Sequence, residues 1–453
     1  MNLREMIIEI LLELERTDGY VNLLLADVLE KYDYLEPREK AFIKRVTEGS
    51  IERKIQIDYV LDGISKVPVK KMKPFIRALL RMSAYQLLFM EAVPDAAVCN
   101  EAVKLVKKRK FGSLQGYVNG VLRNLSRQKE TIVYPVVEKN AAEAFSVLYS
   151  MPLWLTEYFL RLYGLETTEK ILRAFLERKP VTIRLEEGLT IEQREALLAS
   201  WEQKGIAVKD HPYLPYAVQI EKAEGIRHLP GYEEGLFAVQ DVSSMLAVEA
   251  AGIDKGQTVL DLCAAPGGKS LHAASKLAGT GSVLSFDITE AKLLRMEENR
   301  RRMRKENMKT AIGDARIYRE ELHQAADVVL ADVPCSGLGV IGRKPDIKYH
   351  VTEQSLTEIT ALQKEILRNA AAYVKPGGLL LYSTCTITPQ ENEKMVEWLC
   401  REFPFVPEGM RAHLPEELPV DLLAAADTGM LHLLPGVHES DGFFFAKLRR
   451  KRG

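Results

Sequence analysis

Residues 259–269 read Val-Leu-Asp-Leu-Cys-Ala-Ala-Pro-Gly-Gly-Lys, and this stretch decides the fold class. Its apolar start predicts a buried strand over 259–262, and Gly267 and Gly268 allow a tight turn into a following helix. The first N–H groups of such a helix are unpaired and can approach a ligand. The stretch therefore predicts a cofactor cradle of the nucleotide-binding type.

Two better-known loops are excluded by the same residues. A phosphate-binding loop, Gly-x-x-x-x-Gly-Lys-Ser, needs glycine at position 263, where this chain has Cys263. The dinucleotide pattern Gly-x-Gly-x-x-Gly is also absent from this stretch. The loop is thus typical of neither an ATPase nor an NAD enzyme.

Apolar runs at 283–286, 328–331 and 379–382 alternate with helical segments and predict further strands. Near-continuous apolar strands are typical of a parallel sheet that is covered on both faces. Runs at 431–434 and 443–446 are separated by turn residues and predict a closing antiparallel hairpin. The C-terminal half is expected to be a Rossmann-like α/β domain with a mostly parallel sheet.

Acidic residues follow successive strands of this predicted sheet. Asp287 lies about twenty residues past the loop, where an acid can accept hydrogen bonds from ribose hydroxyls. Asp314 follows the third strand and could meet an adenine amino group, and Asp332 ends the fourth strand. An acid-lined cradle suits S-adenosyl-L-methionine, whose sulfur is positively charged and which has no pyrophosphate, better than it suits NAD.

Two of the five cysteines stand where chemistry is expected. Cys335 lies in Asp-Val-Pro-Cys-Ser-Gly, residues 332–337, and Cys385 lies in Ser-Thr-Cys-Thr, residues 383–386; each follows a predicted strand. A thiolate can add to an electron-poor ring carbon and make the neighbouring carbon nucleophilic, which leads to the hypothesis of cytosine C5 methylation. The side chains of Cys99, Cys263 and Cys400 are expected to be small buried groups.

The residues after Cys385 also carry a signal. Thr388-Pro389-Gln390-Glu391 matches a capping box with proline at the first helical position, and predicts a helix that begins at Thr388. The positive end of that helix is expected to lower the pKa of the Cys385 thiol. No Cys-x-x-Cys or His-Glu-x-x-His occurs, so we expect neither a metal site nor a disulfide framework.

The chain is expected to be multidomain: an all-α domain over 1–139, a small α/β subdomain over 140–234 and the methyltransferase-type domain over 235–453. Residues 1–62 carry 9 Lys and Arg against 14 Asp and Glu, whereas residues 63–130 carry 14 against 4. A solvated helical face and a phosphate-contacting surface are equally open interpretations of this basic segment taken alone. Its cations include Lys104, Lys107, Lys108, Arg109, Lys110, Arg123, Arg127 and Lys129.

No apolar run approaches the roughly 20 residues of a membrane span, and residues 1–5 begin a mixed amphipathic pattern without the apolar core of a signal peptide. We therefore expect a soluble, cytoplasmic protein.

The C-terminal domain resembles the NOL1/NOP2/Sun family of RNA cytosine-C5 methyltransferases. The resemblance covers about residues 235–448 and lies in five stretches: 260–269, 332–337, 343–347 (Arg-Lys-Pro-Asp-Ile), 375–378 (Lys-Pro-Gly-Gly) and 382–385 (Tyr-Ser-Thr-Cys). The middle segment is similar to that family's RNA-recognition subdomain through 150–154 and 240–244. The N-terminal third resembles NusB-type RNA-binding domains through 84–88, 100–103 and 118–124.

The resemblance implies roles for the residues singled out above. Cys385 would be the nucleophile at cytosine C6, Asp332 would hydrogen-bond N3 or N4 of the ring, and Cys335 would help to release the product. S-adenosyl-L-methionine would be bound by Cys263, Ala264, Ala265, Pro266, Gly267, Gly268, Lys269, Asp287, Asp314 and Asp332. The implied partner is 16S ribosomal RNA, free or in a partly assembled small subunit, with no membrane partner and with the enzyme as a monomer.

Three alternatives remain open at this point. The same chemistry could act on another structured RNA, either a tRNA or another ribosomal RNA site. A DNA cytosine methyltransferase would use the Pro-Cys cysteine as its nucleophile and would have no Thr-Cys partner, so Cys385 argues against it. A NusB-like assembly factor with an inactive methyltransferase domain would bind RNA without transferring a methyl group.

Overall fold

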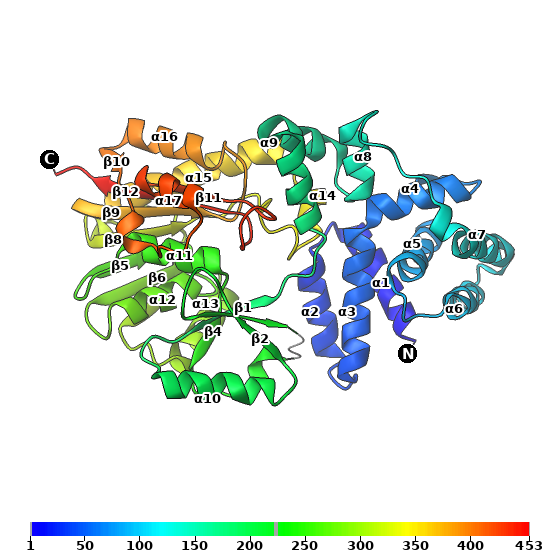
Figure 1. Ribbon diagram of the computed structural model, residues 1–453, viewed down its shortest axis with the longest axis horizontal. Coiled ribbons are helices and arrows are strands. Elements are labelled where there is room, and N and C mark those ends of the chain that lie inside the picture. Colours follow the sequence, from blue (N-terminus) through cyan, green and yellow to red (C-terminus); the bar gives the residue numbers. More distant parts are fainter. Residues whose placement is uncertain (1, 222–224, 453) are drawn as a thin grey trace. The chain divides into compact units, whose positions relative to one another are not determined.

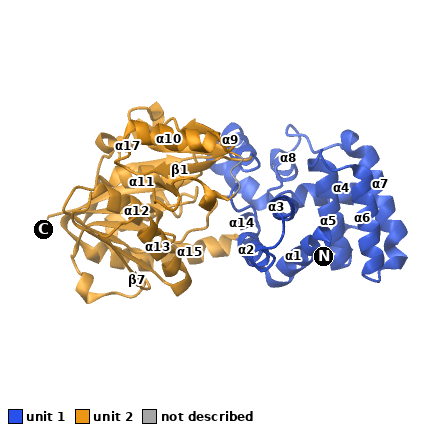
Figure 2. Ribbon diagram, turned by 90° about the horizontal axis from the view of Figure 1, so that it is seen from below, with its two compact units in different colours: residues 1–177, 341–350 blue, residues 178–340, 351–453 orange. Residues whose placement is uncertain are grey.

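The computed structural model describes residues 2–221 and 225–452 of the chain. Contacts divide it into two compact units, which Figure 2 distinguishes by colour: residues 1–177 with 341–350, and residues 178–340 with 351–453. The predicted ranges 1–139, 140–234 and 235–453 stay predictions, since units defined by packing are not thereby shown to fold independently.

The first unit is built from helices. They are α1 (Leu3–Thr17), α2 (Val21–Lys31), α3 (Pro37–Glu52), α4 (Lys54–Ile64), α5 (Pro74–Phe89), α6 (Asp95–Lys108), α7 (Gln115–Gln128), α8 (Ala141–Leu148), α9 (Leu153–Ala174) and α14 (Ile347–His350). Apolar residues at helical spacing, such as Ile7, Leu11 and Leu14 of α1, meet buried residues of α3, α5 and α7 in one core. The predicted all-α N-terminal domain is confirmed.

Helix α14 belongs to this unit although it lies far along the chain. The Asp346 carboxylate accepts a hydrogen bond from the Val21 N–H at the start of α2 (2.6 Å), and Lys348 Nζ donates to the Glu52 carbonyl (2.8 Å). The Tyr349 hydroxyl donates to the Ile51 carbonyl (3.0 Å). The Arg-Lys-Pro-Asp-Ile stretch therefore ends in a segment that packs on the N-terminal helices, which its sequence pattern did not indicate.

The second unit begins with a small antiparallel sheet. Its strands are β1 (Val181–Leu185), β2 (Ala207–Asp210), β3 (Ala217–Glu221) and β4 (Phe237–Val239), in the order β2-β3-β1-β4, with α10 (Ile191–Glu202) between β1 and β2. Trp201 of α10 is fully buried against Phe237. The predicted small α/β subdomain is confirmed.

The larger sheet of this unit follows the order β10-β12-β9-β8-β5-β6-β7 (Figure 1). Its strands are β5 (Thr258–Asp261), β6 (Ser282–Asp287), β7 (Met308–Ile312), β8 (Ala326–Asp332), β9 (Val374–Thr384), β10 (Phe405–Pro407), β11 (Met430–Leu433) and β12 (Phe443–Arg450). Pairs from β7 through β9 are parallel, and β12 pairs antiparallel with β9, β10 and β11. The mostly parallel sheet with a closing hairpin is confirmed.

Helices cover both faces of the larger sheet. They are α11 (Val242–Ala251), α12 (Gly268–Lys276), α13 (Glu290–Arg302), α15 (Glu353–Tyr373), α16 (Glu393–Glu402) and α17 (Val420–Asp427). In β8, Val328 and Leu330 join the core shared with α11 and α12, whereas Val329 and Ala331 join the core shared with α15 and α16. Alternate residues of a strand point to opposite faces, so a continuous apolar run fills both cores.

A membrane span would need a long apolar helix, and none of the helices in the described part of the chain meets that requirement.

Candidate active site

The carboxyl ends of β5, β6, β8 and β9 border one cavity. Its walls enclose about 1160 Å³ of empty space, including solvent at its mouth. Parallel strands present their carboxyl ends at one edge of the sheet, where ligands bind in doubly wound folds. The cavity is lined by Leu262, Cys263, Ala265, Asp287, Ile288, Lys292, Gly313, Asp314, Ala315, Arg316, Asp332, Val333, Pro334, Cys335, Leu362, Ile366 and Cys385.

The glycine-rich loop turns directly from β5 into α12. Gly267 has a φ of +102°, a conformation that side chains rarely adopt, and it precedes the first residue of α12. Of the loop, Cys263 and Ala265 line the cavity. Ala264 is buried in the core below, Pro266 lines a different surface hollow, and Gly267, Gly268 and Lys269 shape the turn without lining the cavity.

Asp287 joins this loop to the end of β6. Its carboxylate accepts hydrogen bonds from the Ala265 N–H (3.0 Å) and the Ile288 N–H (2.7 Å), and it pairs with Lys292 Nζ (3.0 Å). The side chain is 5% exposed and lies at the cavity wall. A carboxylate held by two backbone N–H groups has a fixed direction, which suits it to receive the hydroxyls of a ribose.

Asp314 lies at the same wall but is held differently. It forms a two-pronged contact with Arg316, whose Nη2 lies 2.6 Å from Oδ2. Hydrogen bonding with Arg316 holds the pKa of Asp314 below its ordinary value, against the opposing effect of burial. The carboxylate is therefore charged at neutral pH, but its most direct partner is a neighbouring guanidinium.

Asp332 is the last residue of β8 and lines the cavity. Its carboxylate accepts a hydrogen bond from Lys269 Nζ (2.7 Å) and another from the Ser383 hydroxyl (2.8 Å). Lys269 in turn stands over the ring of Phe443, with Nζ 4.9 Å from the ring centroid. Sequence reasoning assigned Lys269 to the cofactor loop and did not foresee that it neutralises Asp332.

The two thiols predicted to act together do meet. Cys335 Sγ and Cys385 Sγ lie 3.2 Å apart, and both side chains are partly buried at the cavity wall. Each follows one of two adjacent parallel strands, in which Asp332 pairs with Ser383. Hydrogen bonding with Cys385, burial and the nearby charge of Glu391 raise the pKa of the Cys335 thiol well above its usual value.

The path of the chain around Cys385 needs glycine at position 339. The Gly339 N–H donates to the Cys385 carbonyl (3.0 Å), and a Cβ at this position would lie 2.1 Å from the Gly442 carbonyl oxygen. The backbone segments that contain Gly339, Cys385 and Gly442 therefore lie so close together that position 339 has no room for a side chain.

The predicted capping box after Cys385 is wrong in its position. Helix α16 begins at Glu393 with Asn392 as its N-cap, and residues 389–392 form turns instead. The Thr388 hydroxyl does bond to the Glu391 carboxylate (2.8 Å), so the motif closes a local turn rather than a helix end. A capping box would pair each of these side chains with the other residue's backbone N–H, whereas here the two side chains bond to each other and the Glu391 carboxylate has further partners in the core.

Two acids near the site are buried, which sequence reasoning did not foresee: Asp261 was not singled out, and Glu391 was named only as part of the predicted capping box. Asp261 accepts a hydrogen bond from the Ser270 hydroxyl (2.6 Å), and burial raises its pKa to about 7. Glu391 is fully buried beneath the Cys335 turn. An acidic residue within a strand and one in a polar loop look ordinary in sequence; only the burial of the carboxylates distinguishes them.

The remaining three cysteines take no part in the thiol pair. Cys99 is buried in α6 and Cys400 is partly buried in α16, and burial raises the pKa of each. Cys263 differs from the expectation of a purely internal side chain, because it lines the cavity; burial raises its pKa as well.

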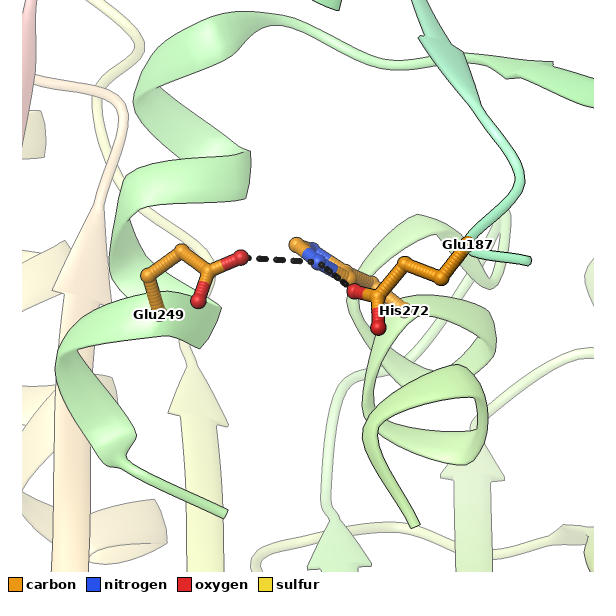
Figure 3. Close-up of side chains that lie close together, drawn as sticks. All are labelled: Glu187, Glu249 and His272. Atoms are coloured by element: carbon orange, nitrogen blue, oxygen red, sulfur yellow. Dashed lines mark ion pairs between the residues drawn. The ribbon is translucent and has the colours of Figure 1, made fainter. Parts of the chain in front are cut away.

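A second cluster of titratable groups lies where the segment just after β1 meets α11 and α12. Glu187, Glu249 and His272 approach one another as a metal-binding group would (Figure 3). The position between the carboxylates is taken by the Lys276 ammonium, at 2.8 Å from Glu187 and 2.6 Å from Glu249. Burial alone would raise the pKa of Glu249, but contacts with His272 and Lys276 hold it at about 2, so the cluster is an ion-pair network.

Half of the eight cations named in the basic segment have acidic partners within the first unit. Lys108 and Arg109 pair with Glu5, Lys104 pairs with Glu101, and Lys129 pairs with Asp95. Arg123 donates instead to the Asn119 side chain (3.1 Å). Within the described residues, the exposed Lys107, Lys110 and Arg127 have no acidic partner, which leaves them available for phosphates.

Family models match three consecutive parts of the chain. Residues 250–449 match the model for the 16S rRNA methyltransferase RsmB/F, residues 1–127 match the NusB family, and residues 151–227 match the ferredoxin-like domain of RsmF/B-like methyltransferases. These matches agree with the cofactor cradle, the helical unit and the small antiparallel sheet.

Relatives match over the whole length. The chain is 35% identical over 456 residues to a probable ribosomal RNA small subunit methyltransferase B of Bacillus subtilis, covering 99% of each sequence. It is 33% identical to ribosomal RNA small subunit methyltransferase B of Escherichia coli, covering 91% of each. Among solved structures, that of PH0851 superposes with a TM-score of 0.79 at 27% identity and 99% coverage of each chain.

The chain therefore belongs to the RsmB/F family of ribosomal RNA methyltransferases with an N-terminal NusB domain, which confirms the resemblance found in the sequence. It is an S-adenosyl-L-methionine-dependent methyltransferase that acts on ribosomal RNA. The acid-lined cavity fits this cofactor, because its carboxylates suit both ribose hydroxyls and a sulfonium.

Proposed function

We propose that this protein methylates C5 of one cytosine in 16S ribosomal RNA through a transient covalent bond between Cys385 and C6 of the base. The observation that carries the proposal is the thiol pair: Cys335 and Cys385 lie 3.2 Å apart on the wall of a cavity that also presents Asp287 and Asp332. Two thiols at one cofactor site suit a reaction in which one sulfur bonds the substrate and the other assists its departure.

The first step is addition of the Cys385 thiolate to C6. Its electron pair forms the S–C6 bond, and charge develops on the far edge of the ring at N3 and O2. Asp332 lies at that wall with its carboxylate bonded to Lys269 Nζ. It can accept a hydrogen bond from the N4 amino group of the ring, while the positive charge of Lys269 offsets the charge that develops at N3. S-adenosyl-L-methionine, when bound, would supply an electrophilic methyl group. C5 accepts it with the electron pair made available by the addition, and the electron pair of the broken S–CH3 bond stays on the sulfur of the departing S-adenosylhomocysteine.

Release completes the reaction. The proton on C5 is lost to water, its electron pair restores the C5–C6 double bond, and the C6–S bond breaks. The Cys335 thiol, whose pKa is raised, is protonated and can donate its proton to the departing Cys385 sulfur. Without that donor the covalent adduct is expected to persist.

The proposal extends to the binding roles. Of the loop 263–269, Cys263 and Ala265 line the cavity and would contact the cofactor together with Asp287, the other loop residues would shape the turn that holds it, and Asp314 would lie nearer the adenine. The base must leave its stack to reach the thiol, at a cost of a few kcal/mol that is least in unpaired RNA. Free or partly assembled subunit RNA in the cytoplasm, bound by a monomeric enzyme, is the substrate that we propose, with Lys107, Lys110 and Arg127 as phosphate contacts.

The test uses purified protein, methyl-labelled cofactor and unmodified 16S ribosomal RNA, followed by bisulfite sequencing. Cys385→Ala should abolish transfer, whereas Cys335→Ala should accumulate a protein–RNA adduct on a denaturing gel. Cys400→Ala, which changes a thiol on α16, is the matched control and should transfer normally. An adduct with Cys385→Ala would reverse the two roles, and label in tRNA alone would refute the proposed substrate.

A further inference from the structure

One buried carboxylate beneath the thiol pair has no part in the steps above. Glu391 lies in the turn between β9 and α16 and is fully buried. Its Oε2 accepts hydrogen bonds from the Ser336 N–H (2.8 Å) and Gln363 Nε2 (3.1 Å). Its Oε1 accepts from the Ser336 hydroxyl (2.6 Å) and the Thr388 hydroxyl (2.8 Å). Four donors thus converge on one carboxylate.

Two of the four bonds hold the residue that directly follows Cys335. Because the Ser336 N–H and hydroxyl bond to different oxygens of Glu391, the peptide after Cys335 is fixed in both position and direction. The Ser336 hydroxyl also lies 2.7 Å from the hydroxyl of Thr386, the residue that follows Cys385. The network therefore joins the two chain segments that carry the thiols.

The remaining two bonds anchor the carboxylate itself. Gln363 belongs to α15, and its side-chain amide also donates to the Pro334 carbonyl (3.0 Å), on the other side of Cys335. Burial of a carboxylate is costly unless donors replace its water, and here three of the four bonds come from Ser336, which follows Cys335, or from Gln363, which also bonds Pro334. A group with only a packing role could be apolar at lower cost.

We propose that Glu391 is a positioning residue for product release: it fixes the loop segment 334–337 so that the Cys335 thiol stays within reach of the Cys385 sulfur. This inference rests on the proposed function. Loss of Glu391 should free this segment while leaving β9 and Cys385 in place, because Cys385 continues directly from a strand that is paired on both sides. Attack on the base would then proceed, and departure of Cys385 would be slow.

The experiment follows the covalent adduct in single-turnover reactions of the full chain with 16S ribosomal RNA. Glu391→Ala should accumulate adduct as Cys335→Ala does, with release about tenfold slower, the effect expected for loss of one charge-assisted hydrogen bond. Glu391→Gln keeps an oxygen for the Ser336 N–H, and its amide can donate to the two hydroxyls, so it should release faster than Glu391→Ala. The matched control is Glu397→Ala, an exposed glutamate of α16, which should behave as the unchanged protein.

The outcomes separate the inference from the function on which it rests. A merely structural role would reduce adduct formation and cofactor binding together, and would not increase the adduct. Normal release by Glu391→Ala, or loss of adduct with normal cofactor binding, would overturn the inference while Cys335→Ala still traps its adduct. If neither cysteine variant behaves as proposed, the function fails instead. Should Glu391→Ala not fold, Ser336→Ala carries the same expectation, and normal release by that variant would overturn it.

Discussion

Cys335 and Cys385 hold their sulfur atoms 3.2 Å apart although fifty residues separate them along the chain. The cause is the parallel pairing of β8 with β9, which places Asp332 beside Ser383 and so brings the two strand ends to one corner. Sulfur atoms at this distance need to move only about 1 Å closer to form a disulfide, whose bond length is about 2 Å.

Mild oxidation should therefore inactivate the enzyme reversibly. Diamide accepts one hydrogen from each thiol and is reduced to its hydrazine, while the two sulfurs form a bond. We expect non-reducing peptide mapping to find the Cys335–Cys385 linkage, and dithiothreitol to restore transfer. Bound RNA should protect the two thiols from oxidation by diamide. Diamide that leaves transfer intact, or that links other cysteines first, would show that the two thiols do not approach in solution.

Asp332→Asn should impair chemistry more than cofactor binding. It removes the charge that pairs with Lys269 and places an amide at the ring edge, so the rate of methyl transfer should fall about 10²- to 10³-fold. Calorimetric affinity for S-adenosyl-L-methionine should change by less than about threefold if Asp332 serves mainly the base. Asp327→Asn alters a similar Lys–Asp pair in the same strand, with Lys375, and should leave transfer nearly unchanged.

Asp287→Asn and Asp314→Asn should differ in their effect on cofactor affinity. Each oxygen of Asp287 accepts a hydrogen bond from a different backbone N–H group, so the amide nitrogen of an asparagine would be opposed to one of these N–H donors. We expect the affinity for the cofactor to fall tenfold or more, which corresponds to the loss of about one charge-assisted hydrogen bond. Asp314 is compensated by Arg316, and its replacement should cost about threefold. Equilibrium dialysis with labelled cofactor measures both, and an equal loss would contradict the assignment of Asp287 to the ribose.

Asp261 should make the protein less stable as pH rises. Burial raises its pKa from the ordinary 3.8 to about 7, so between these values the folded state binds more protons than the unfolded state. The stabilising contribution is full below about pH 4 and is lost as pH rises through 7. Urea unfolding at pH 5 and pH 7.5 should show that the free energy of unfolding falls less with pH in Asp261→Asn than in the unchanged chain. An equal change of the free energy with pH in the two proteins would refute the raised pKa.

Lys348 should have the opposite effect. Burial lowers the pKa of its ammonium from 10.5 to about 7, so the unfolded state binds more protons between these values and stability rises with pH there. Lys348→Met cannot charge, and its stability advantage at pH 7 should shrink as pH approaches 10. Thermal unfolding followed by circular dichroism at several pH values provides the test, and a difference that stays constant with pH would contradict it.

Much of the architecture was predictable because burial leaves a periodic trace. The apolar runs at 259–262, 328–331 and 379–382 contribute side chains to the cores on both faces of the sheet, and such continuous runs predict central strands. The residue at which a helix begins was harder to predict from the sequence. Residues 388–391 have the side chains of a capping box, yet α16 begins at Glu393. Local spacing cannot reveal that Ser336 and Gln363, from other elements, also bond to Glu391.

By itself the sequence determined the order of the strands along the chain, the glycine turn at 267 and the two cysteines at strand ends, since each depends on neighbouring residues and on the two-residue period of a strand. The tertiary structure alone decided which partners these groups meet: Lys269 beside Asp332, Glu391 beneath Cys335, and residues 341–350 on the N-terminal helices. The physical reason is that hydrogen bonds and ion pairs act over a few ångströms in space, whereas the partners are tens to hundreds of residues apart in the chain.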